Sequence, residues 1–400
     1  MELTAPGGDL NKIKTAIKYG ADAVYCGYKL FGLRASATNL SKAELMEAIA
    51  FVHNHKAKLY LTLNAYLKNC DYPALRDFLL WLKDSGTDAV IVSDPGVFTM
   101  VQSITQIPIH VSTQANVCSV QAAHFWHNLG AKRIVVAREM SFAEIVETKA
   151  ALPDLEIECF IHGAMCVAYS GRCLLSAYFN RRSANSGACT QVCRWNWALT
   201  QQERAGEYLP VEEDQYGSHI LSSKDLCMLS KIPLMQKAGI DAGKIEGRMK
   251  SEYYVAQLCR VYRKAMESSG QDSSVWEMLR EELQKVSHRP YWEGFYDFPA
   301  GDAGIVEKSD QSAYISKSEY CGKVIAHEDG NMVFDCLAKI SLGDTIELIF
   351  PEINQDIRLQ VNKIYDNDYK ELVCTKPNAR FRVPLAQKDV LGALIRRCLD

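Results

Sequence analysis

The sequence predicts an α/β protein: a TIM-like (β/α)8 barrel followed by a small C-terminal β-barrel domain. Through roughly the first 300 residues, short β-branched runs alternate with helical patterns about every 25 to 30 residues, as consecutive βα units do. Eight such runs occur, and eight parallel strands close a TIM-type barrel. A doubly wound open sheet has the same alternation and is the alternative architecture.

The predicted strands are short, and polar residues follow most of them. They are Glu2–Ala5, Ala23–Cys26, Lys58–Asn64, Ala89–Ser93, Ile107–Ser112, Arg133–Ala137, Glu156–His162 and Ala242–Glu246. Helix-boundary signals separate them. Ser41 with Glu44, and Ser141 with Glu144, have the spacing of a capping box, and Pro73 suits a first helical turn. Glycines suit the helix ends at positions 20, 86, 130 and 239.

Two departures from this alternation predict the domain organisation. After about residue 310 the pattern changes to short strands with turn signals at 328–331 and 342–344, which predicts a barrel domain over 1–310 and a β-barrel domain over 311–400. The longest interruption, at about 163–222, follows the seventh strand. Because barrel active sites are built at the carboxyl ends of the strands, this insertion is the expected site.

Composition narrows the possible partners and the compartment. The net charge of −3 over 400 residues gives no global nucleic-acid signature, so a polyanion would have to meet a local basic patch. No apolar run of about 18 residues and no secretion signal can be found, so we expect a cytoplasmic protein without a membrane span. In a reducing compartment, the 14 cysteines are expected to be buried thiols and metal ligands.

Four cysteines fall in the insertion. Cys166, Cys173, Cys189 and Cys193 are separated by six, fifteen and three residues in a loop rich in Gly, Ser, Asn and Arg. Structural zinc usually prefers two tight pairs, whereas iron-sulfur clusters tolerate varied spacing. The spacing favours a cluster and leaves zinc or unconnected thiols open. Cys227, which we expect to open a helix beyond the loop, is the competing ligand.

Residues at the carboxyl ends of the predicted strands should converge on one face of the barrel. These site candidates are Asn64, Asp94, Gln114, Arg138, Glu139, His162 and Glu246. His162, four residues before Cys166, could move protons or bind substrate, or it could be a hydrogen-bonded structural histidine.

The segment 244–250 places several charges at a strand-to-helix junction. A substrate with a carboxylate or phosphate would explain Lys244 and Arg248, and an internal ion pair with Glu246 is the alternative.

A local basic feature lies in the same insertion. Arg181, Arg182 and Arg194 are interleaved with Trp195 and Trp197, which suits RNA phosphates and bases but also suits a solvated loop with packed tryptophans. No GxGxxG, GxxxxGK, HExxH or GxSxG motif occurs, which lowers the expectation of dinucleotide binding, phosphate-loop hydrolysis, zincin proteolysis and a nucleophile elbow.

Several blocks of the sequence resemble the collagenase-like peptidase family U proteins. They are ECFIHGAMC (158–166), SGRCLLS (170–176), RSANSGACTQVCR (182–194), KIEGRMKS (244–251), ELTAPGG (2–8), GADAVY (20–25) and HVSTQAN (110–116). The resemblance implies a 4Fe-4S cluster on Cys166, Cys173, Cys189 and Cys193, although some relatives take one ligand from elsewhere.

Within that family, the length and the intact cysteine pair look most like the tRNA 5-hydroxyuridine hydroxylases, which modify the wobble uridine and take the hydroxyl group from prephenate. The resemblance thus implies tRNA and a prephenate-like dicarboxylate as partners, oxygen-independent chemistry, and Lys244, Arg248 and Arg138 as carboxylate partners. His162 and Glu246 are the catalytic candidates, with Asn64 and Gln114 in substrate binding. The alternatives are a collagenase-like protease, a hydroxylase of another RNA or small molecule, and a non-catalytic iron-sulfur or zinc protein that binds RNA.

Overall fold

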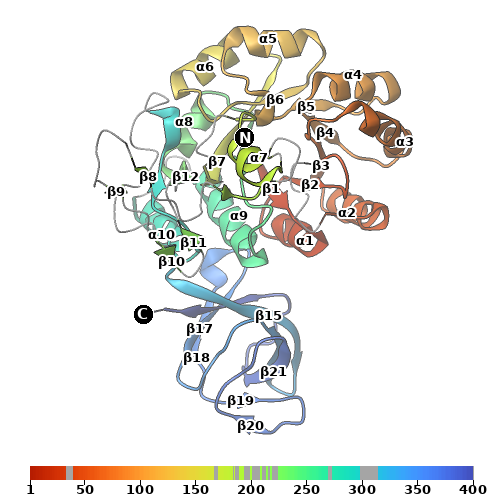
Figure 1. The fold of residues 1–400 in the computed structure, drawn as a ribbon. Helices are drawn as coiled ribbons and strands as arrows, with labels where there is room; N and C mark the ends of the chain where they lie inside the picture. Colours follow the sequence, from red (N-terminus) through yellow and green to blue (C-terminus); the bar gives the residue numbers. More distant parts are fainter. Residues whose placement is uncertain are drawn as a thin grey trace.

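Eight parallel strands close into a barrel surrounded by helices in the computed structural model, which confirms the predicted fold class (Figure 1). The structure describes residues 1–32, 39–165, 170–182, 184, 189–192, 199–200, 208–209, 213–214, 217–218, 224–268, 273–297 and 314–399. The barrel strands are β1 (Glu2–Gly7), β2 (Ala23–Gly27), β3 (Lys58–Leu63), β4 (Ala89–Val92), β5 (Ile109–Val111), β6 (Arg133–Val135), β7 (Glu156–Ala164) and β13 (Ala242–Ile245). All eight predicted strands are therefore present.

Strand β13 closes the barrel. Ala242 pairs in parallel with Glu2 of β1 on one side and with Glu158 of β7 on the other. Because β13 has a partner on both edges, the open doubly wound sheet is excluded. The register of β13 against β7 shifts between Lys244 and Ile245, at the carboxyl end of the barrel.

The helices for which boundary signals were found in the sequence begin or end at or close to them. They are α1 (Leu10–Lys18), α2 (Lys42–Asn54), α3 (Tyr72–Leu82), α4 (Pro95–Ile104), α5 (Val120–Asn128), α6 (Phe142–Ala151), α7 (Leu175–Asn180), α8 (Ile232–Lys237), α9 (Glu252–Glu267) and α10 (Ser273–Leu283). Ser41 and Ser141 form the expected capping boxes with Glu44 and Glu144. Except for α7, these helices pack their apolar faces on the outside of the barrel in one large core.

Two further strands extend the sheet beyond the barrel, and the sequence did not predict them. Strand β12 (Asp225–Cys227) runs antiparallel to β7, and β14 (Tyr291–Trp292) runs parallel to β12. The expectation that Cys227 opens a helix is wrong, because Cys227 ends β12 and pairs with His162. Strand β12 contains no β-branched residue and β14 has only two residues, so neither shows the pattern by which the barrel strands were predicted.

The C-terminal region is a curled antiparallel sheet, drawn in blue in Figure 1. Its strands are β15 (Ser318–Glu328), β16 (Asn331–Cys336), β17 (Thr345–Ile349), β18 (Ile357–Gln360), β19 (Ile364–Tyr365), β20 (Glu371–Leu372), β21 (Ala379–Pro384) and β22 (Leu394–Cys398). The predicted turn at 328–331 joins β15 to β16. The predicted domain boundary at 310 lies outside the described residues.

Two short hairpins fall in the predicted insertion at about 163–222. They are β8 (Leu199–Thr200) with β9 (Tyr208–Leu209), and β10 (Glu213–Asp214) with β11 (Gly217–Ser218).

A chain of buried charges crosses the inside of the barrel. Lys244 donates to Glu158 at 2.8 Å, and Arg133 lies 3.2 Å from Glu158 and 2.7 Å from Glu2. The ammonium of Lys244 also lies 4.0 Å from the centre of the Tyr25 ring. Burial alone would raise the pKa of Glu158, but Lys244 and Arg133 outweigh it and hold that pKa below its usual value. The interior is therefore charged but internally paired.

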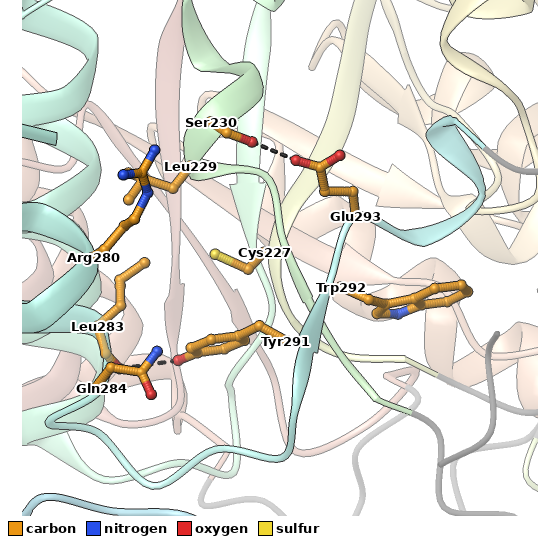
Figure 2. Close-up of a pocket in the computed structure, with 9 residues that line it drawn as sticks. All are labelled: Cys227, Leu229, Ser230, Arg280, Leu283, Gln284, Tyr291, Trp292 and Glu293. Atoms are coloured by element: carbon orange, nitrogen blue, oxygen red, sulfur yellow. Dashed lines mark hydrogen bonds between the residues drawn. The ribbon is translucent and has the colours of Figure 1, made fainter. Parts of the chain in front are cut away.

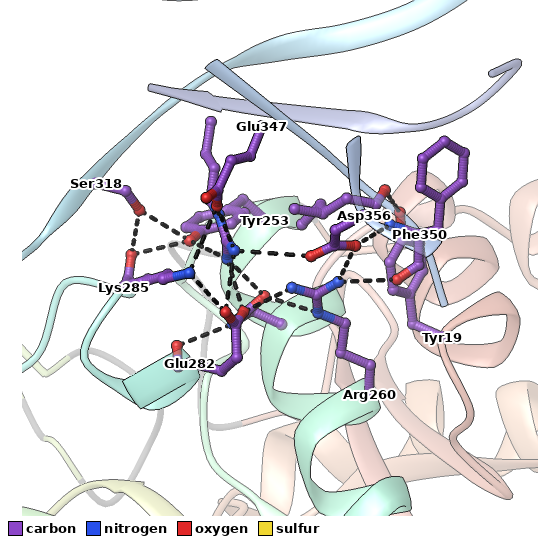
Figure 3. Close-up of polar contacts among 12 residues, drawn as sticks. Tyr19, Tyr253, Arg260, Glu282, Lys285, Ser318, Glu347, Phe350 and Asp356 are labelled. Atoms are coloured by element: carbon purple, nitrogen blue, oxygen red, sulfur yellow. Dashed lines mark hydrogen bonds and ion pairs between the residues drawn. The ribbon is translucent and has the colours of Figure 1, made fainter. Parts of the chain in front are cut away.

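A second buried ionic cluster joins the barrel to the C-terminal sheet (Figure 3). Arg260 of α9 lies 2.7 Å from both Glu282 of α10 and Asp356, which precedes β18. Arg396 of β22 lies 3.0 Å from Glu282 and 2.6 Å from Glu347 of β17. Both guanidinium groups are buried. Each arginine thus bridges carboxylates from both parts of the chain, and we call these five residues the ionic joint.

Among the described helices, none combines the length and the apolar character needed to span a lipid bilayer.

Substitution of Arg396 by Met should lower the free energy of unfolding by about 3–5 kcal/mol, because Glu282 and Glu347 each lose a contact with a buried guanidinium. Burial opposes ionisation of Glu282, but Arg396 and Arg260 hold its pKa below the ordinary 4.5. The stabilisation of the fold by the ionised Glu282 is therefore present above pH 4.5 and is lost as the pH falls. Urea unfolding of the wild type and of Arg396→Met should give a difference in the free energy of unfolding that becomes smaller as the pH falls.

The matched control is Arg380→Met, since the Arg380–Asp335 pair is about half exposed. Exposed pairs contribute about 0–1 kcal/mol, so this variant should unfold close to the wild type. Equal losses in the two variants would contradict a stabilising role for the ionic joint.

Candidate functional site

Arg248 lies at the carboxyl end of the barrel, where the predicted site residues were expected to converge. Its guanidinium donates to Thr62 Oγ1 at 3.3 Å and to Asn39 Oδ1 at 2.6 Å, so it reaches the ends of β3 and β2 from the loop after β13. Both of these oxygens are uncharged. These two contacts hold the buried guanidinium in one orientation at this end of the barrel.

Gly27, the last residue of β2, makes room for this cation. A Cβ atom at Gly27 would lie 2.1 Å from Nη2 of Arg248 and 2.5 Å from Oδ1 of Asn39. Any side chain there would displace the guanidinium. The glycine therefore belongs to the binding geometry of Arg248.

Residues 170–173 cross the same face of the barrel and are held to it at two points. The backbone N–H of Ser170 donates to Glu139 at 2.9 Å, just beyond β6. Gly171 lies against the loop after β5, because a Cβ at that position would lie 2.2 Å from the carbonyl oxygen of Gln114. The Tyr66 hydroxyl donates to the same carbonyl at 2.7 Å. These contacts fix the segment that leads to Cys173 at the mouth of the barrel.

A second set of contacts joins the segments that carry Cys173 and Cys189. Ser176, three residues after Cys173, accepts from the backbone N–H of Thr190 at 3.0 Å, and the two hydroxyls lie 2.8 Å apart. Asn180 also donates to Thr190 at 2.9 Å. Cys189 directly precedes Thr190, so helix α7 ties the two half-buried cysteines into one unit.

The other two predicted ligands, Cys166 and Cys193, lie outside the described residues, as do Arg194, Trp195 and Trp197. Within the part of the chain that the structure describes, no group of three potential metal ligands occurs. Only two of the four cysteines belong to that part of the chain, so the ligand set stays a prediction.

The predicted substrate-binding residues occupy different environments at this face. Asn64 is half-buried and lies one residue past β3. Gln114 lies three residues past β5 and accepts the hydrogen bond from Tyr66 at its backbone carbonyl. Arg138 donates to the carbonyl of Ala164 at 2.9 Å and lies 4.1 Å above the Phe160 ring. Their roles in binding stay predictions.

Lys244 and Glu246 do not form the internal ion pair that we considered. Lys244 is buried inside the barrel with Glu158 as its partner, and burial lowers its pKa. Glu246 lies just after β13, where its backbone N–H donates to His162 at 2.8 Å and its side chain is half-buried. The structure therefore brings Arg248, and not Lys244, to the mouth beside the ends of β2 and β3.

The His162 side chain lies between the barrel wall and helix α9. Its Nδ1 atom is 3.0 Å from the Tyr262 hydroxyl, which itself donates to the Ile161 carbonyl at 2.9 Å. The imidazole Nδ1–H is therefore the donor, and Nε2 is buried without a hydrogen-bond partner among the described residues. The rings of Tyr254, Tyr262 and Tyr291 surround it. Burial lowers the pKa of His162 to about 3, so the imidazole is neutral near pH 7.

A pocket of about 250 Å³ lies next to β12 and β14, outside the barrel (Figure 2). Its lining includes Cys227, Arg280, Gln284, Tyr291 and Glu293. Burial raises the pKa of Cys227 to about 11, so its thiol stays protonated near neutral pH. Cys227 lies on β12, the strand next to β7 outside the barrel, and it lines this pocket together with residues of α10.

Sequence reasoning missed three residues that shape the mouth: Asn39, Thr62 and Tyr66. Thr62 was within a predicted strand, but the inward direction of its hydroxyl depends on the barrel. Tyr66 follows β3 by three residues, and its position two residues beyond Asn64 was an available signal. Asn39 lies in a loop without periodicity and had no such signal.

Fold and site together define a (β/α)8-barrel protein with a cysteine-bearing segment fixed across the carboxyl end of its strands. The model of Peptidase family U32 matches residues 8–304, and the chain belongs to that family. This confirms the resemblance seen in the sequence motifs.

Three relatives illustrate the range of names in the family. The chain is 37% identical over 379 residues to tRNA hydroxylation protein P1 of Bacillus subtilis, covering 93% of this chain and 88% of that protein. It is 33% identical over 404 residues to tRNA hydroxylation protein P of Escherichia coli, covering 90% and 88%. It is 32% identical over 309 residues to a protein of Porphyromonas gingivalis named Collagenase, covering 74% and 73%.

The pKa of His162 predicts a measurable protonation behaviour. Because the native pKa of about 3 is below the ordinary 6.5, the imidazole should stay neutral, with its proton on Nδ1, at every pH where the fold persists. Histidine-selective ¹⁵N NMR between about pH 8 and 5 should show no titration of the signal that His162→Phe removes. A midpoint within that interval would contradict the buried environment.

The sign of the accompanying stability effect follows from the same shift. A depressed histidine pKa stabilises the native state above pH 6.5, and the contribution is lost as the pH falls toward 3. The wild type should therefore lose more stability in acid than His162→Phe does.

Proposed function

We propose that this chain is an RNA-modifying enzyme that hydroxylates a uridine of tRNA at C5, at the wobble position. The names of the two relatives that it matches over 88% of their length support the substrate class. The geometric observation that carries the proposal is the attachment of residues 170–173 to Glu139 and Gln114, which holds Cys173 at the same end of the barrel as the buried guanidinium of Arg248. An RNA substrate of this kind also implies a cytoplasmic protein.

The proposed cofactor is a 4Fe-4S cluster on Cys166, Cys173, Cys189 and Cys193. Four thiolates form a soft donor set that suits a cluster. The described half of that set fits, because Cys173 and Cys189 are half-buried and are tied together through Ser176 and Thr190. When bound, such a cluster supplies redox or Lewis-acid chemistry.

The proposed hydroxyl donor is prephenate or a similar dicarboxylate. Arg248 would bind one carboxylate, since its planar fork matches that group and its position is fixed by Thr62 and Asn39. The reaction replaces C5–H of the uridine by C5–OH while the donor exchanges C–OH for C–H. Oxidation of the uridine is thus balanced by reduction of the donor, and dioxygen is not consumed.

His162 and Glu246 remain the candidate catalytic groups of this proposal. A neutral imidazole that carries its proton on Nδ1 can accept a hydrogen bond at its buried Nε2 atom, but its low pKa keeps it from taking up a proton near pH 7. The backbone of Glu246 is bonded to that of His162, because its N–H donates to the His162 carbonyl oxygen. In this proposal His162 accepts a hydrogen bond at Nε2, and the carboxylate of Glu246 holds a proton next to the bound substrate.

A collagenase-like peptidase is the alternative, favoured by the relative named Collagenase. A thiol protease needs a thiolate beside a protonated imidazole. Cys227 and His162 are cross-strand partners, but burial raises the pKa of Cys227 to about 11 and lowers that of His162 to about 3. Both groups are therefore neutral at pH 7, which argues against this pair. Gelatin cleavage by purified protein that His162→Ala abolishes would reverse the assignment.

The cluster assignment predicts matched effects of cysteine substitutions. Cells that lack their own hydroxylases and express the wild type should contain 5-hydroxyuridine in their tRNA by nucleoside mass spectrometry, and cells expressing Cys173→Ser or Cys189→Ser should contain none. Purified variants should lose iron and sulfide together. Cys70→Ser, at an exposed position outside the site, is the control and should retain both.

Hydroxylation that survives complete loss of iron would exclude the cluster from the chemistry. Zinc in place of iron, with tRNA binding but no product, would favour the non-catalytic RNA-binding alternative. If another RNA is hydroxylated in place of tRNA, the proposed reaction stands and the proposed substrate is replaced by that RNA.

Substitution of Arg248 by Lys tests the donor site. Lysine keeps the charge but loses the two-pronged contact, so the KM for prephenate should rise on the order of ten-fold while the affinity for tRNA is unchanged. Arg263→Lys, which alters a partly exposed ion pair with Asp22, is the control. An unchanged KM for prephenate would remove Arg248 from the donor site.

A further inference from the structure

Helix α7 presents large apolar side chains to solvent beside the cysteines. Tyr178 is 80% exposed, Leu174 is 74% exposed and Phe179 is 43% exposed. The rings of Tyr178 and Phe179 lie 4.9 Å apart in an edge-to-face arrangement. Adjacent exposed aromatic side chains on a short helix mark a surface that contacts another molecule.

The opposite face of α7 is fixed. Ser176 and Asn180, which are four residues apart and share one helical face, both bond to Thr190. Tyr178 lies midway between them in sequence, so its side chain leaves the helix on the other side. The exposed ring is thus carried by a helix that is already anchored, which lowers the entropy lost when a ligand stacks on it.

The charge of the residues around α7 in the sequence indicates which kind of ligand this surface binds. Residues 159–202 contain four arginines and no aspartate or glutamate, in a protein whose net charge is −3. Two of these arginines, Arg181 and Arg182, directly follow α7, and both are exposed. Neither forms an ion pair with any residue that the structure describes. A basic segment without acidic residues favours a polyanion over a protein surface.

We propose that α7 is a stacking platform for an unpaired nucleotide of the RNA: the base stacks on Tyr178, and Arg181 and Arg182 contact the flanking phosphates. Aromatic faces bind bases of any identity, and arginines hold the backbone on either side. This inference rests on the proposed function, since it takes RNA as the substrate. It adds the residues that hold a single-stranded loop next to Cys173 and Cys189.

Fluorescence anisotropy tests the platform with the full chain and a labelled anticodon stem-loop RNA as the probe. Tyr178→Ala should weaken binding about ten-fold, whereas Tyr178→Phe, which keeps the aromatic face, should bind like the wild type. Phe125→Ala removes another exposed aromatic ring, on α5, and should have no effect. In Arg181→Gln/Arg182→Gln, the slope of log Kd against log salt should fall by roughly 1 to 1.5.

The outcomes separate this inference from the proposed function. RNA binding that depends on Tyr178 in a protein that forms no hydroxyuridine would support the platform and refute the hydroxylase. If Tyr178→Ala binds the RNA as tightly as the wild type and still forms hydroxyuridine, the hydroxylase is supported and the platform is refuted. Wild-type protein that does not bind the RNA, or equal losses in Tyr178→Ala, Tyr178→Phe and Phe125→Ala, would overturn the platform.

Discussion

Glu158 is fully buried in the wall of the barrel, and its charge is tolerated only because Lys244 and Arg133 both reach it. A closed barrel excludes water from its interior, so each charge there needs a partner. Strand β13 supplies one of those partners and also closes the sheet, so barrel closure and charge balance depend on the same four residues. Lys244 is thereby committed to the interior. Arg248, four residues further along, is the cation of this segment that lies against the ends of β2 and β3.

The mouth combines three elements that the chain delivers separately. The loop after β13 brings Arg248, the insertion after β7 brings the cysteines, and α7 brings exposed aromatic and basic side chains. Contacts with Glu139, Gln114 and Thr190 fix the second and third elements relative to the barrel. In the proposed reaction, the donor carboxylate, the cofactor and an unpaired base would meet on this surface, as a group transfer between two substrates requires.

The barrel was predictable because its information is local. Runs of β-branched residues, capping boxes and glycines at helix ends each depend on a few neighbouring residues, and all eight strands were found in this way. Partner choice was not local: Lys244 pairs with Glu158 on the adjacent strand and not with Glu246, two residues away. Likewise, His162 was correctly placed on the seventh strand, but the packing of α9 decides that its ring lies among tyrosines. Strand β12 escaped prediction because its three residues, Asp225 to Cys227, include no β-branched residue, whereas the equally short β5 and β6 each contain two.

The ionic joint also limits how this chain can be altered by evolution or by exchange with its relatives. Arg260 and Glu282 belong to the barrel helices, whereas Glu347, Asp356 and Arg396 belong to the C-terminal sheet. A foreign sheet grafted onto this barrel would leave an arginine or a carboxylate buried and unmatched unless it carried the same complementary charges. The two parts are therefore expected to be inherited as a pair, and a chimera is expected to fold only when both halves of the joint come from one parent.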